Sequence, residues 1–307
     1  MNLMHLRYFC KLAEIENYTV AAAELYISQP GLSGAIISIE KELGLKLFEK
    51  SGRNIKLTKY GSEFYKYINE ALRVLDKGVS VMHEYSGKLT GKIEIGAIPT
   101  IQTTFLPEVL ADFKERCENI EIKVYEGHTK QIVENLQESL YDVGFCSYDV
   151  NNAELEAIPV LNQKVVAIMH KDHPLAEQTS LTFEDILKYR IYTYSMSQLI
   201  GKQFRDLLAE QKLEVNWKNI HFDYPNELLI AGILSHGSPK KDSNQTIGLI
   251  ANVPYLENFN DLSIIPIEDV PENFRKVYMV YNKNKFRTHA IDLFMDFVKT
   301  NYSLEQE

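Results

Sequence analysis

The segment Thr19–Lys50 reads TVAAAELYISQPGLSGAIISIEKELGLKLFEK, and it decides the fold of the first part of the chain. We expect a short helix from about Thr19 to Leu25, with the side chain of Thr19 capping its start. Tyr26 and Ile27 form the turn that follows. The segment therefore predicts two helices packed at an angle, the second presented to a partner.

The second helix is predicted to begin after Ser28, because serine is a good N-cap and Pro30 would stand in the first turn, where its missing N–H costs little. One face carries an apolar stripe at helical spacing, formed by Leu32, Ile36, Ile39 and Leu43. The other faces carry small and polar residues, among them Gln29, Ser33, Gly34, Ile37 and Ser38. A helix end of this kind fits a DNA major groove, which is about 12 Å wide.

Charge is distributed unevenly along the chain. The net charge is −9, yet residues 1–60 contain eight Lys/Arg and six Asp/Glu. Lys50, Arg53, Lys56 and Lys59 follow one another without an intervening acid. Two short extended pieces, 47–50 and 55–58, flank the turn at 52–54, which predicts a hairpin with a basic tip. A hairpin beside a helix-turn-helix is a wing, and this one would lie along phosphates.

A long helix is predicted from about Lys59 to Tyr85. Apolar residues recur on it in steps of three and four, at Phe64, Ile68, Ala71, Leu75, Val79 and Met82. This seam predicts pairing with another chain, and packing on its own domain is the alternative. Ser86, Gly87 and Gly91 then indicate a hinge.

From Lys92 to Thr300 extended and helical patterns alternate, which predicts an α/β fold with parallel sheets in two small lobes. One extended run covers Val160–His170. The polar segment 237–245 is expected to be a flexible loop.

Several function classes are disfavoured. The chain has no apolar run of about 18 residues and no signal-peptide core, so we expect a cytoplasmic protein without membrane contact. Cys10, Cys117 and Cys146 are widely spaced, which argues against a zinc site or a disulfide framework and favours buried thiols over a redox switch at Cys146. The motifs GxSxG, GxxxxGK[ST], HExxH and GxGxxG are absent. We expect no catalytic residues, no metal and no cofactor.

Residues 1–65 resemble the DNA-binding domain of LysR-type transcriptional regulators. The matching positions have fixed spacings: Phe9, Ala13, Ala22-Ala23, Leu25, Ser28-Gln29-Pro30, Leu32-Ser33, Ile36, Glu40, Leu43-Gly44, Leu47-Phe48, Leu57-Thr58 and Gly61. The remainder is similar to the family's effector domain in length and strand order.

The resemblance implies a winged helix-turn-helix domain at 1–58, a linker (dimerisation) helix and hinge at 59–90, and a two-lobed, periplasmic-binding-protein-like (type 2) effector domain at 91–307. Lobe I would span about 91–162 and 268–307, and lobe II about 163–267. It implies a homodimer or homotetramer that bends double-stranded promoter DNA, a small-molecule effector in the inter-lobe cleft, and RNA polymerase as a candidate partner. A small-molecule binding protein or an enzyme of the same two-lobed class, without DNA output, is the alternative.

The resemblance also assigns roles at the DNA. Gln29, Pro30, Ser33 and Gly34 would face the groove, and Thr19, Ser28, Lys50 and Arg53 would hold the backbone. Gly34 and Ala35 stand where the family often has Arg, Gln or His, and neither can form a bidentate bond to a base. We therefore expect an A·T-rich site read largely through methyl contacts and shape. Lys50 replaces a usual arginine, which loses the planar fork.

Effector contacts are expected where strands end and helices begin. The candidates from the predicted first lobe are Thr100, Gln102, Thr103, His128, Thr129 and Ser147, and those from the second are Tyr194 and Ser195. For each Ser or Thr, a role in a turn or helix cap is the alternative. His128 could sense ligand charge or pH, or lie exposed. No arginine falls in these loops, which disfavours a dicarboxylate that needs a guanidinium fork.

Overall fold

The computed structural model describes residues 2–52, 54–85, 91–148, 152–211, 213–236 and 245–304. The predictions for Arg53, for the hinge at Ser86 and Gly87, and for the loop 237–244 lie outside these residues. Residues 2–85, together with 138–140 and 286–288, form one compact unit, and the other described residues form a second. Each unit is treated by itself. No helix in the described ranges combines the length and apolar character needed to cross a membrane.

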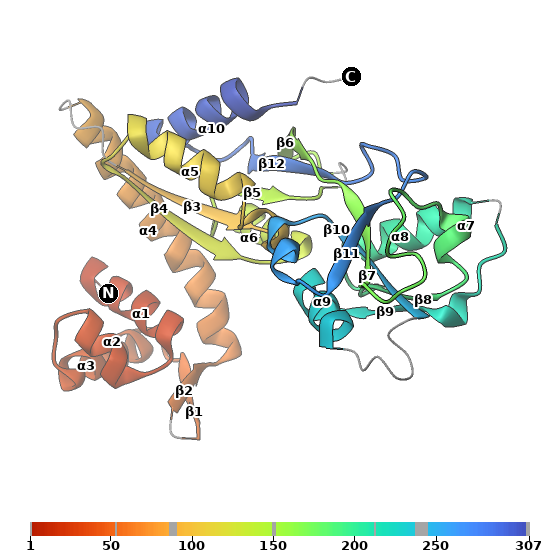
Figure 1. Cartoon of the computed structure of the whole chain (residues 1–307). Coiled ribbons are helices and arrows are strands. Elements are labelled where there is room, and N and C mark those ends of the chain that lie inside the picture. The colour runs from red at the N-terminus through yellow and green to blue at the C-terminus, as the bar shows by residue number, and fades with distance from the viewer. Residues whose placement is uncertain are drawn as a thin grey trace. The chain divides into compact units, whose positions relative to one another are not determined.

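Three helices open the first unit (Figure 1): α1 (Leu3–Ile15), α2 (Tyr18–Glu24) and α3 (Gln29–Leu43). The prediction that Thr19 caps α2 is wrong, because the side chain of Asn17 accepts the backbone N–H groups of Thr19 and Val20. Asn17 is placed before the first turn, whereas Thr19 is already helical. The cap at Ser28 is confirmed, since its hydroxyl accepts the N–H of Gly31 at 3.2 Å.

The apolar faces of these helices meet in one core. Phe9, Leu12, Leu32, Ile36 and Ile39 are all at most 1% exposed. The expected stripe of α3 is thus confirmed except at its end, where Leu43 is half-buried. Burying such side chains contributes about 1.5–3 kcal/mol each, so the angle between α1 and α3 depends on this face.

The predicted wing is present as the antiparallel strands β1 (Phe48–Ser51) and β2 (Asn54–Leu57). It is attached through Glu40, a carboxylate of α3 that is only 8% exposed. Glu40 Oε1 accepts the N–H groups of Leu47, at 2.9 Å, and Phe48, at 3.4 Å. Its Oε2 pairs with the ammonium group of Lys46. Helix α3 and the wing are therefore held together by one buried carboxylate.

The long helix α4 spans Lys59–Tyr85, as predicted. It starts against the wing, where Thr58 accepts the N–H of Gly61 and donates to the carbonyl of Lys46. A Cβ at Gly61 would lie 2.0 Å from the carbonyl oxygen of Leu47, so only glycine permits this approach.

The seam of α4 divides into two halves. Phe64 and Ile68 pack partly buried against the core of the first unit, so the alternative of packing on its own domain holds there. Leu75, Val79 and Met82 are 50%, 56% and 61% exposed. Among the described seam residues, the large exposed apolar side chains therefore lie in the C-terminal half.

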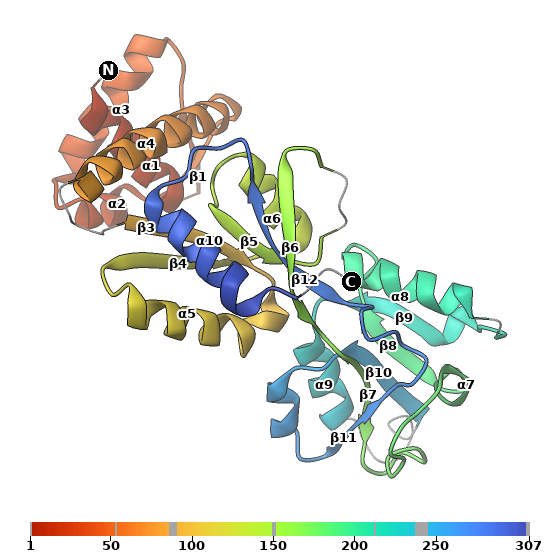
Figure 2. The ribbon, with the colours of Figure 1, turned by 90° about the horizontal axis from the view of Figure 1, so that it is seen from above.

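The second unit contains two five-stranded sheets. The first has the order β4-β3-β5-β12-β6 and consists of β3 (Gly91–Ala97), β4 (Ile120–Glu126), β5 (Val143–Cys146), β6 (Leu155–Asn162) and β12 (Lys276–Asn282). Helices α5 (Phe105–Arg116) and α10 (His289–Tyr302) cover one face, and α6 (Thr129–Gln137) covers the other (Figures 1 and 2).

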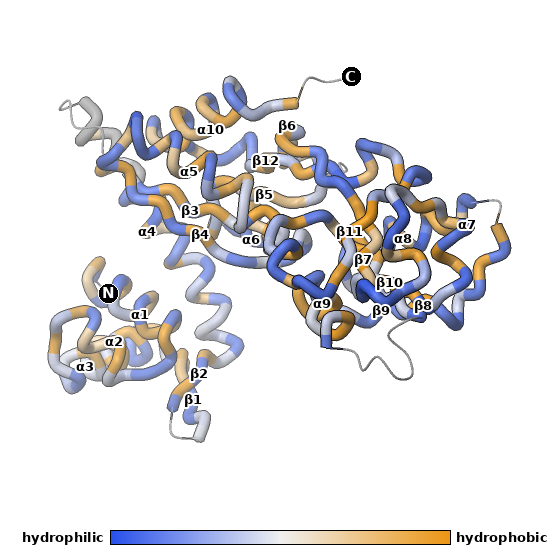
Figure 3. The backbone as a smooth tube through the Cα atoms, viewed as in Figure 1, coloured by the Kyte–Doolittle hydropathy of each residue, from blue (hydrophilic) through white to orange (hydrophobic). Residues whose placement is uncertain are grey.

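The second sheet has the order β11-β7-β10-β8-β9. Its strands are β7 (Val165–His170), β8 (Arg190–Tyr194), β9 (Ile220–Tyr224), β10 (Thr246–Ala251) and β11 (Leu262–Pro266). The helices around it are α7 (Phe183–Ile186), α8 (Leu199–Glu210) and α9 (Glu227–His236). Its central strands β7 and β10 are hydrophobic (Figure 3), because residues on both of their sides are buried.

Two expectations for this unit need correction. The sheets are mixed, since β12 runs antiparallel to β5 and β6, and β7 runs antiparallel to β10 and β11. The extended run Val160–His170 is divided between β6 in the first sheet and β7 in the second. The chain changes sheets at residues 163–164 and returns between β11 and β12, so two crossing segments join the sheets.

We expect Glu40→Ala to loosen the wing specifically, because it leaves the N–H groups of Leu47 and Phe48 without an acceptor. A loss of about 2 kcal/mol accelerates amide exchange in residues 46–57 roughly 30-fold. Hydrogen–deuterium exchange with mass spectrometry measures this segment directly. Lys41→Ala, at an exposed neighbour on α3, is the control, and equal exchange in both variants would contradict the role of Glu40.

Candidate functional site

The exposed face of α3 carries the residues that the sequence analysis assigned to a DNA groove. Gln29, Pro30 and Gly34 are exposed, and Ser33 is half-buried. Ala35 is 5% exposed and faces the core. A Cβ at Gly34 would meet nothing within 4 Å, so this part of the helix surface is bare. The face is narrow and weakly polar, with Gln29 its principal hydrogen-bonding side chain.

Three of the four residues predicted to hold a nucleic-acid backbone lie in the described part of the chain. Thr19 and Lys50 are exposed, whereas the hydroxyl of Ser28 is engaged in its cap. Lys56 pairs with Glu49 across the hairpin at 3.1 Å, and the ammonium group of Lys59 lies 4.9 Å from the centre of the Tyr60 ring. The charge of the predicted basic cluster is therefore partly offset by Glu49, which leaves Lys50 as its exposed member on β1.

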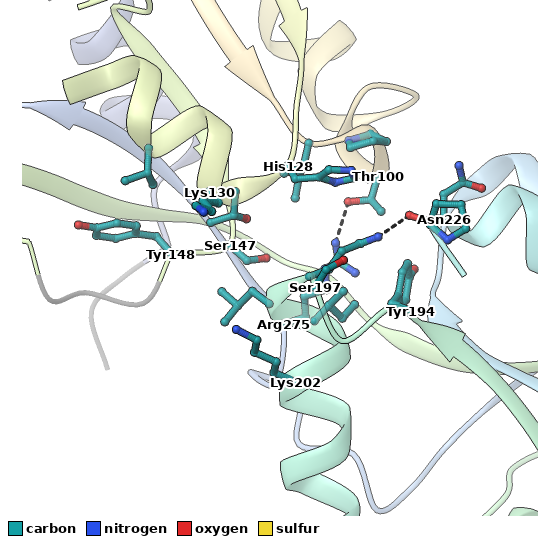
Figure 4. Close-up of a pocket in the computed structure, with 18 of the residues that line it drawn as sticks. Thr100, His128, Lys130, Ser147, Tyr148, Tyr194, Ser197, Lys202, Asn226 and Arg275 are labelled. Atoms are coloured by element: carbon teal, nitrogen blue, oxygen red, sulfur yellow. Dashed lines mark hydrogen bonds between the residues drawn. The ribbon is translucent and has the colours of Figure 1, made fainter. Parts of the chain in front are cut away.

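The second unit contains a cavity of about 510 Å³ where the two sheets meet (Figure 4). Five of the eight predicted effector residues line it: Thr100, His128, Thr129, Ser147 and Tyr194. They follow strands β3, β4 and β5 or end strand β8, as the topology requires. The residues predicted from the sequence therefore reach the cavity from both sheets.

The other three predicted residues do not line the cavity. Gln102 instead donates its side-chain amide to the carbonyl of Ala97 at 3.0 Å, and Thr103 is exposed. Ser195 bonds through its hydroxyl to that of Ser197 at 3.0 Å, and Ser197 is the one that faces the cavity. For Ser195 and Thr103, which lie outside the cavity, the stated alternative of a turn role fits better, and Gln102 is bonded to the backbone.

Arg275 lines the cavity and was not among the predicted residues. It lies directly before β12, in the segment that returns from the second sheet to the first, and is 4% exposed. Its Nη2 donates to Thr100 Oγ1 at 3.1 Å, as Figure 4 shows. The guanidinium carbon lies 5.7 Å from the centre of the Tyr194 ring. No arginine falls in the loops considered in the sequence analysis, but Arg275 reaches the cavity from another segment, so the argument against a dicarboxylate loses its basis.

A buried carboxylate also lines the cavity. Glu227, in the first turn of α9, is 1% exposed and accepts the hydroxyl of Tyr194 at 3.1 Å and the hydroxyl of Tyr255. The Tyr194 oxygen also accepts the N–H of Ala251 at 3.0 Å. Burial raises the pKa of both tyrosines well above its ordinary value, so they stay protonated. The hydroxyl of Tyr194 is thus occupied by hydrogen bonds within the protein, which leaves its ring to contact a ligand in the cavity.

The cysteines behave as buried small hydrophobes, as the first interpretation held. Cys10 and Cys146 are buried, Cys117 is half-buried, and burial raises the pKa of the first two to about 12. Their thiolate fraction at neutral pH is therefore very small, which disfavours oxidation. Within the described ranges no cluster of His, Cys, Asp or Glu is arranged to hold a metal ion.

Two family models match the chain. The bacterial regulatory helix-turn-helix protein, lysR family, matches residues 3–62, and the LysR substrate binding domain matches residues 86–237. The chain is 27% identical over 310 residues to the HTH-type transcriptional regulator BenM of Acinetobacter baylyi, covering 99% of this chain and 97% of that protein.

It is 32% identical to the uncharacterized HTH-type transcriptional regulator YvbU of Bacillus subtilis, over 61% of this chain and 63% of that protein. Among solved structures, the effector binding domain of QuiR in complex with shikimate superposes with a TM-score of 0.60. That match has 23% identity and covers 69% of this chain and 99% of that chain, which supports the fold of the second unit.

Proposed function

Because this chain belongs to the LysR family of bacterial transcriptional regulators, we propose that residues 1–58 bind promoter DNA, that residues 59–90 pair two chains, and that residues 91–307 hold the effector. The protein is a DNA-binding regulator whose promoter binding is modulated by a small molecule. The observation that carries the proposal is the geometry of α3, whose apolar stripe is buried while Gln29 and Gly34 are exposed. We propose no enzymatic activity and a cytoplasmic location.

At the DNA, we assign base contacts to Gln29, Pro30, Ser33 and Gly34. Backbone contacts fall to Thr19, Ser28, Lys50 and Arg53. The exposed amide of Gln29 can pair with adenine in the major groove, and no arginine stands on this face to bind guanine. The bare surface at Gly34 allows close approach to thymine methyl groups. An A·T-rich site read partly through DNA shape follows.

The oligomer is assigned to the C-terminal half of the α4 seam. Leu75, Val79 and Met82 lie on one stripe and are at least half exposed, which is unfavourable for a lone helix in water. A second copy of α4 would cover them. A homodimer, or a homotetramer built from two such dimers, would span both halves of a symmetric DNA site and bend it. At that promoter the protein would contact RNA polymerase.

For the effector, the cavity of the second unit is the site we propose. Its volume of about 510 Å³ lies within the range of about 300–1,000 Å³ that small-molecule sites occupy. Thr100, His128, Thr129 and Ser147 reach it from the first sheet and Tyr194 from the second, so an occupant would contact both. Ligand-dependent closure would then alter the bend imposed on DNA.

Selection of bound sequences from random duplex DNA with the purified full-length protein tests the function. We expect a two-fold-symmetric, A·T-rich motif with few guanine-specific positions. No enrichment at low salt would remove the DNA-binding assignment.

On the selected duplex, Lys50→Ala should weaken binding to every sequence and lower the slope of log affinity against log salt by about 0.9, one phosphate contact. Titrations by fluorescence anisotropy between low and moderate salt measure both. Lys56→Ala is the matched control, because Lys56 is already paired with Glu49 and should change the slope less. An equal change in both variants would contradict the assignment to Lys50.

Val79→Asp should weaken self-association about tenfold or more, since it buries an unpaired carboxylate in the seam. Sedimentation equilibrium over a range of concentrations measures this. Val74→Asp introduces the same charge at a residue of nearly equal exposure, 59% against 56%, turned about 100° from the seam. If Val74→Asp dissociates the protein as much as Val79→Asp, the seam is not the interface.

A further inference from the structure

We propose that the effector is a small organic anion whose carboxylate is bound by Arg275, with the hydroxyls of Thr100 and Ser147 completing the subsite. This inference rests on the proposed function, because it names the chemical class of the molecule that occupies the cavity. It assigns the central role to a residue outside the loops from which effector contacts were predicted.

The guanidinium of Arg275 is buried without an ion-pair partner among the described residues. An arginine is charged at every pH that a protein experiences and has five N–H groups to satisfy. Arg275 is 4% exposed, and its Nε and Nη1 are buried atoms without a hydrogen-bond partner. Its contacts in the described chain are the neutral hydroxyl of Thr100, at 3.1 Å from Nη2, and the face of the Tyr194 ring. These are weak compensation for a charge removed from water.

The buried carboxylate of the same cavity is hydrogen-bonded to two tyrosines and not to Arg275. Glu227 lines the same cavity, but its two oxygens accept the hydroxyls of Tyr194 and Tyr255. Arg275 forms no ion pair with any carboxylate among the described residues. Truncating one partner of a buried pair is strongly destabilising because it leaves such a lone charge. The guanidinium of Arg275 therefore lacks an anionic partner, and a ligand bound in the cavity can supply one.

Ser147 adds an independent observation from another element. It follows β5, is 5% exposed, lines the same cavity, and its Oγ is also buried without a partner. A hydroxyl can donate to a carboxylate oxygen, and the hydroxyl of Thr100 can do so while it accepts from Arg275. Two hydroxyls and a guanidinium thus reach one space from three segments of the chain (Figure 4).

The remaining lining favours an anion with a carbon skeleton. Lys202 adds positive charge at an exposed position, whereas Lys130 lies 3.8 Å from the carboxylate of Glu134, which also lines the cavity. The N-cap of α8, Gln198, makes no side-chain bond to its first turn. Apolar walls come from Ile98, Val133, Leu199 and Ile200. A cavity of about 510 Å³ is far larger than one carboxylate. Arginine also recognises carboxylate through parallel N–H bonds, which fits a planar anion.

Acetate is the probe, because it carries the carboxylate alone and needs no knowledge of the remainder of the effector. Acetamide has the same shape without the charge. Thermal unfolding of the full-length protein is followed in graded acetate, acetamide or inorganic phosphate, with sodium chloride holding ionic strength constant. At an acetate concentration tenfold above its Kd we expect Tm to rise by roughly 3 °C. Acetamide should leave Tm unchanged. Phosphate should shift it less than acetate does.

Arg275→Met should weaken acetate binding about tenfold or more, and Arg275→Lys should weaken it less, because the charge remains while the fork is lost. Lys202→Met removes an exposed lining charge and should change the acetate Kd by no more than about twofold. If Arg275→Met does not fold, two measurements still test the carboxylate subsite. They are the comparison of acetate with acetamide on the wild-type protein and the loss of acetate affinity expected in Ser147→Ala.

Equal shifts with acetate and acetamide would overturn the proposal, as would an acetate shift that survives in Arg275→Met. A larger shift with phosphate would assign the subsite to phosphate and overturn the carboxylate class. These outcomes are separate from the DNA experiment: acetate binding without sequence enrichment would refute the regulator and leave the anion subsite standing.

Discussion

The second unit depends on one constraint, which is that its chain crosses twice between the sheets at the same place. The first crossing, at Gln163, and the second, at Arg275, are joined by a backbone bond of 2.8 Å from the N–H of Gln163 to the carbonyl of Arg275. The side-chain amide of Gln163 also donates to the carbonyl of Thr100 at 3.2 Å. Three segments remote in sequence are thereby held together, and the cavity opens where they meet. A movement of one sheet relative to the other would therefore strain or rearrange these hydrogen bonds.

The fold was predictable where the signals are local. Helix α4 has the bounds that its apolar period and flanking residues indicate, and Ser28 caps α3 because serine, proline and an apolar stripe agree there. The start of α2 was misread because Asn17 and Thr19 are both good caps and differ by only half a turn. The strand that continues from β6 into β7 was misread because no glycine or proline marks the change of sheet. Strand direction in a mixed sheet depends on pairings between distant segments, which periodicity does not contain.

The candidate site divides in the same way. Ser147 and Tyr194 could be found because each is the last residue of a predicted strand, and Thr100 because it lies in the loop after one. Such strand ends converge at one edge of a sheet. Gln102 and Ser195 stand one or more residues further along and turn back to the backbone or to a neighbour. Arg275 could not be found, since its burial follows from the pairing of two crossings more than 100 residues apart. From sequence alone it is one more charged residue before a strand.

Gly34 gives the DNA-binding face a property that the remainder of the domain lacks. A glycine inside a helix costs about 0.5–1 kcal/mol relative to alanine, and here no neighbouring atom requires it, because a Cβ would stand in open space. The packed face of α3 tolerates few replacements, whereas this position accepts side chains of any length. Under the proposed assignment of Gly34 to the DNA groove, a single codon change there would alter which promoters a descendant of this protein recognises while its core stays untouched. The buried face of α3 is thus constrained by folding, whereas the exposed position Gly34 is free to change.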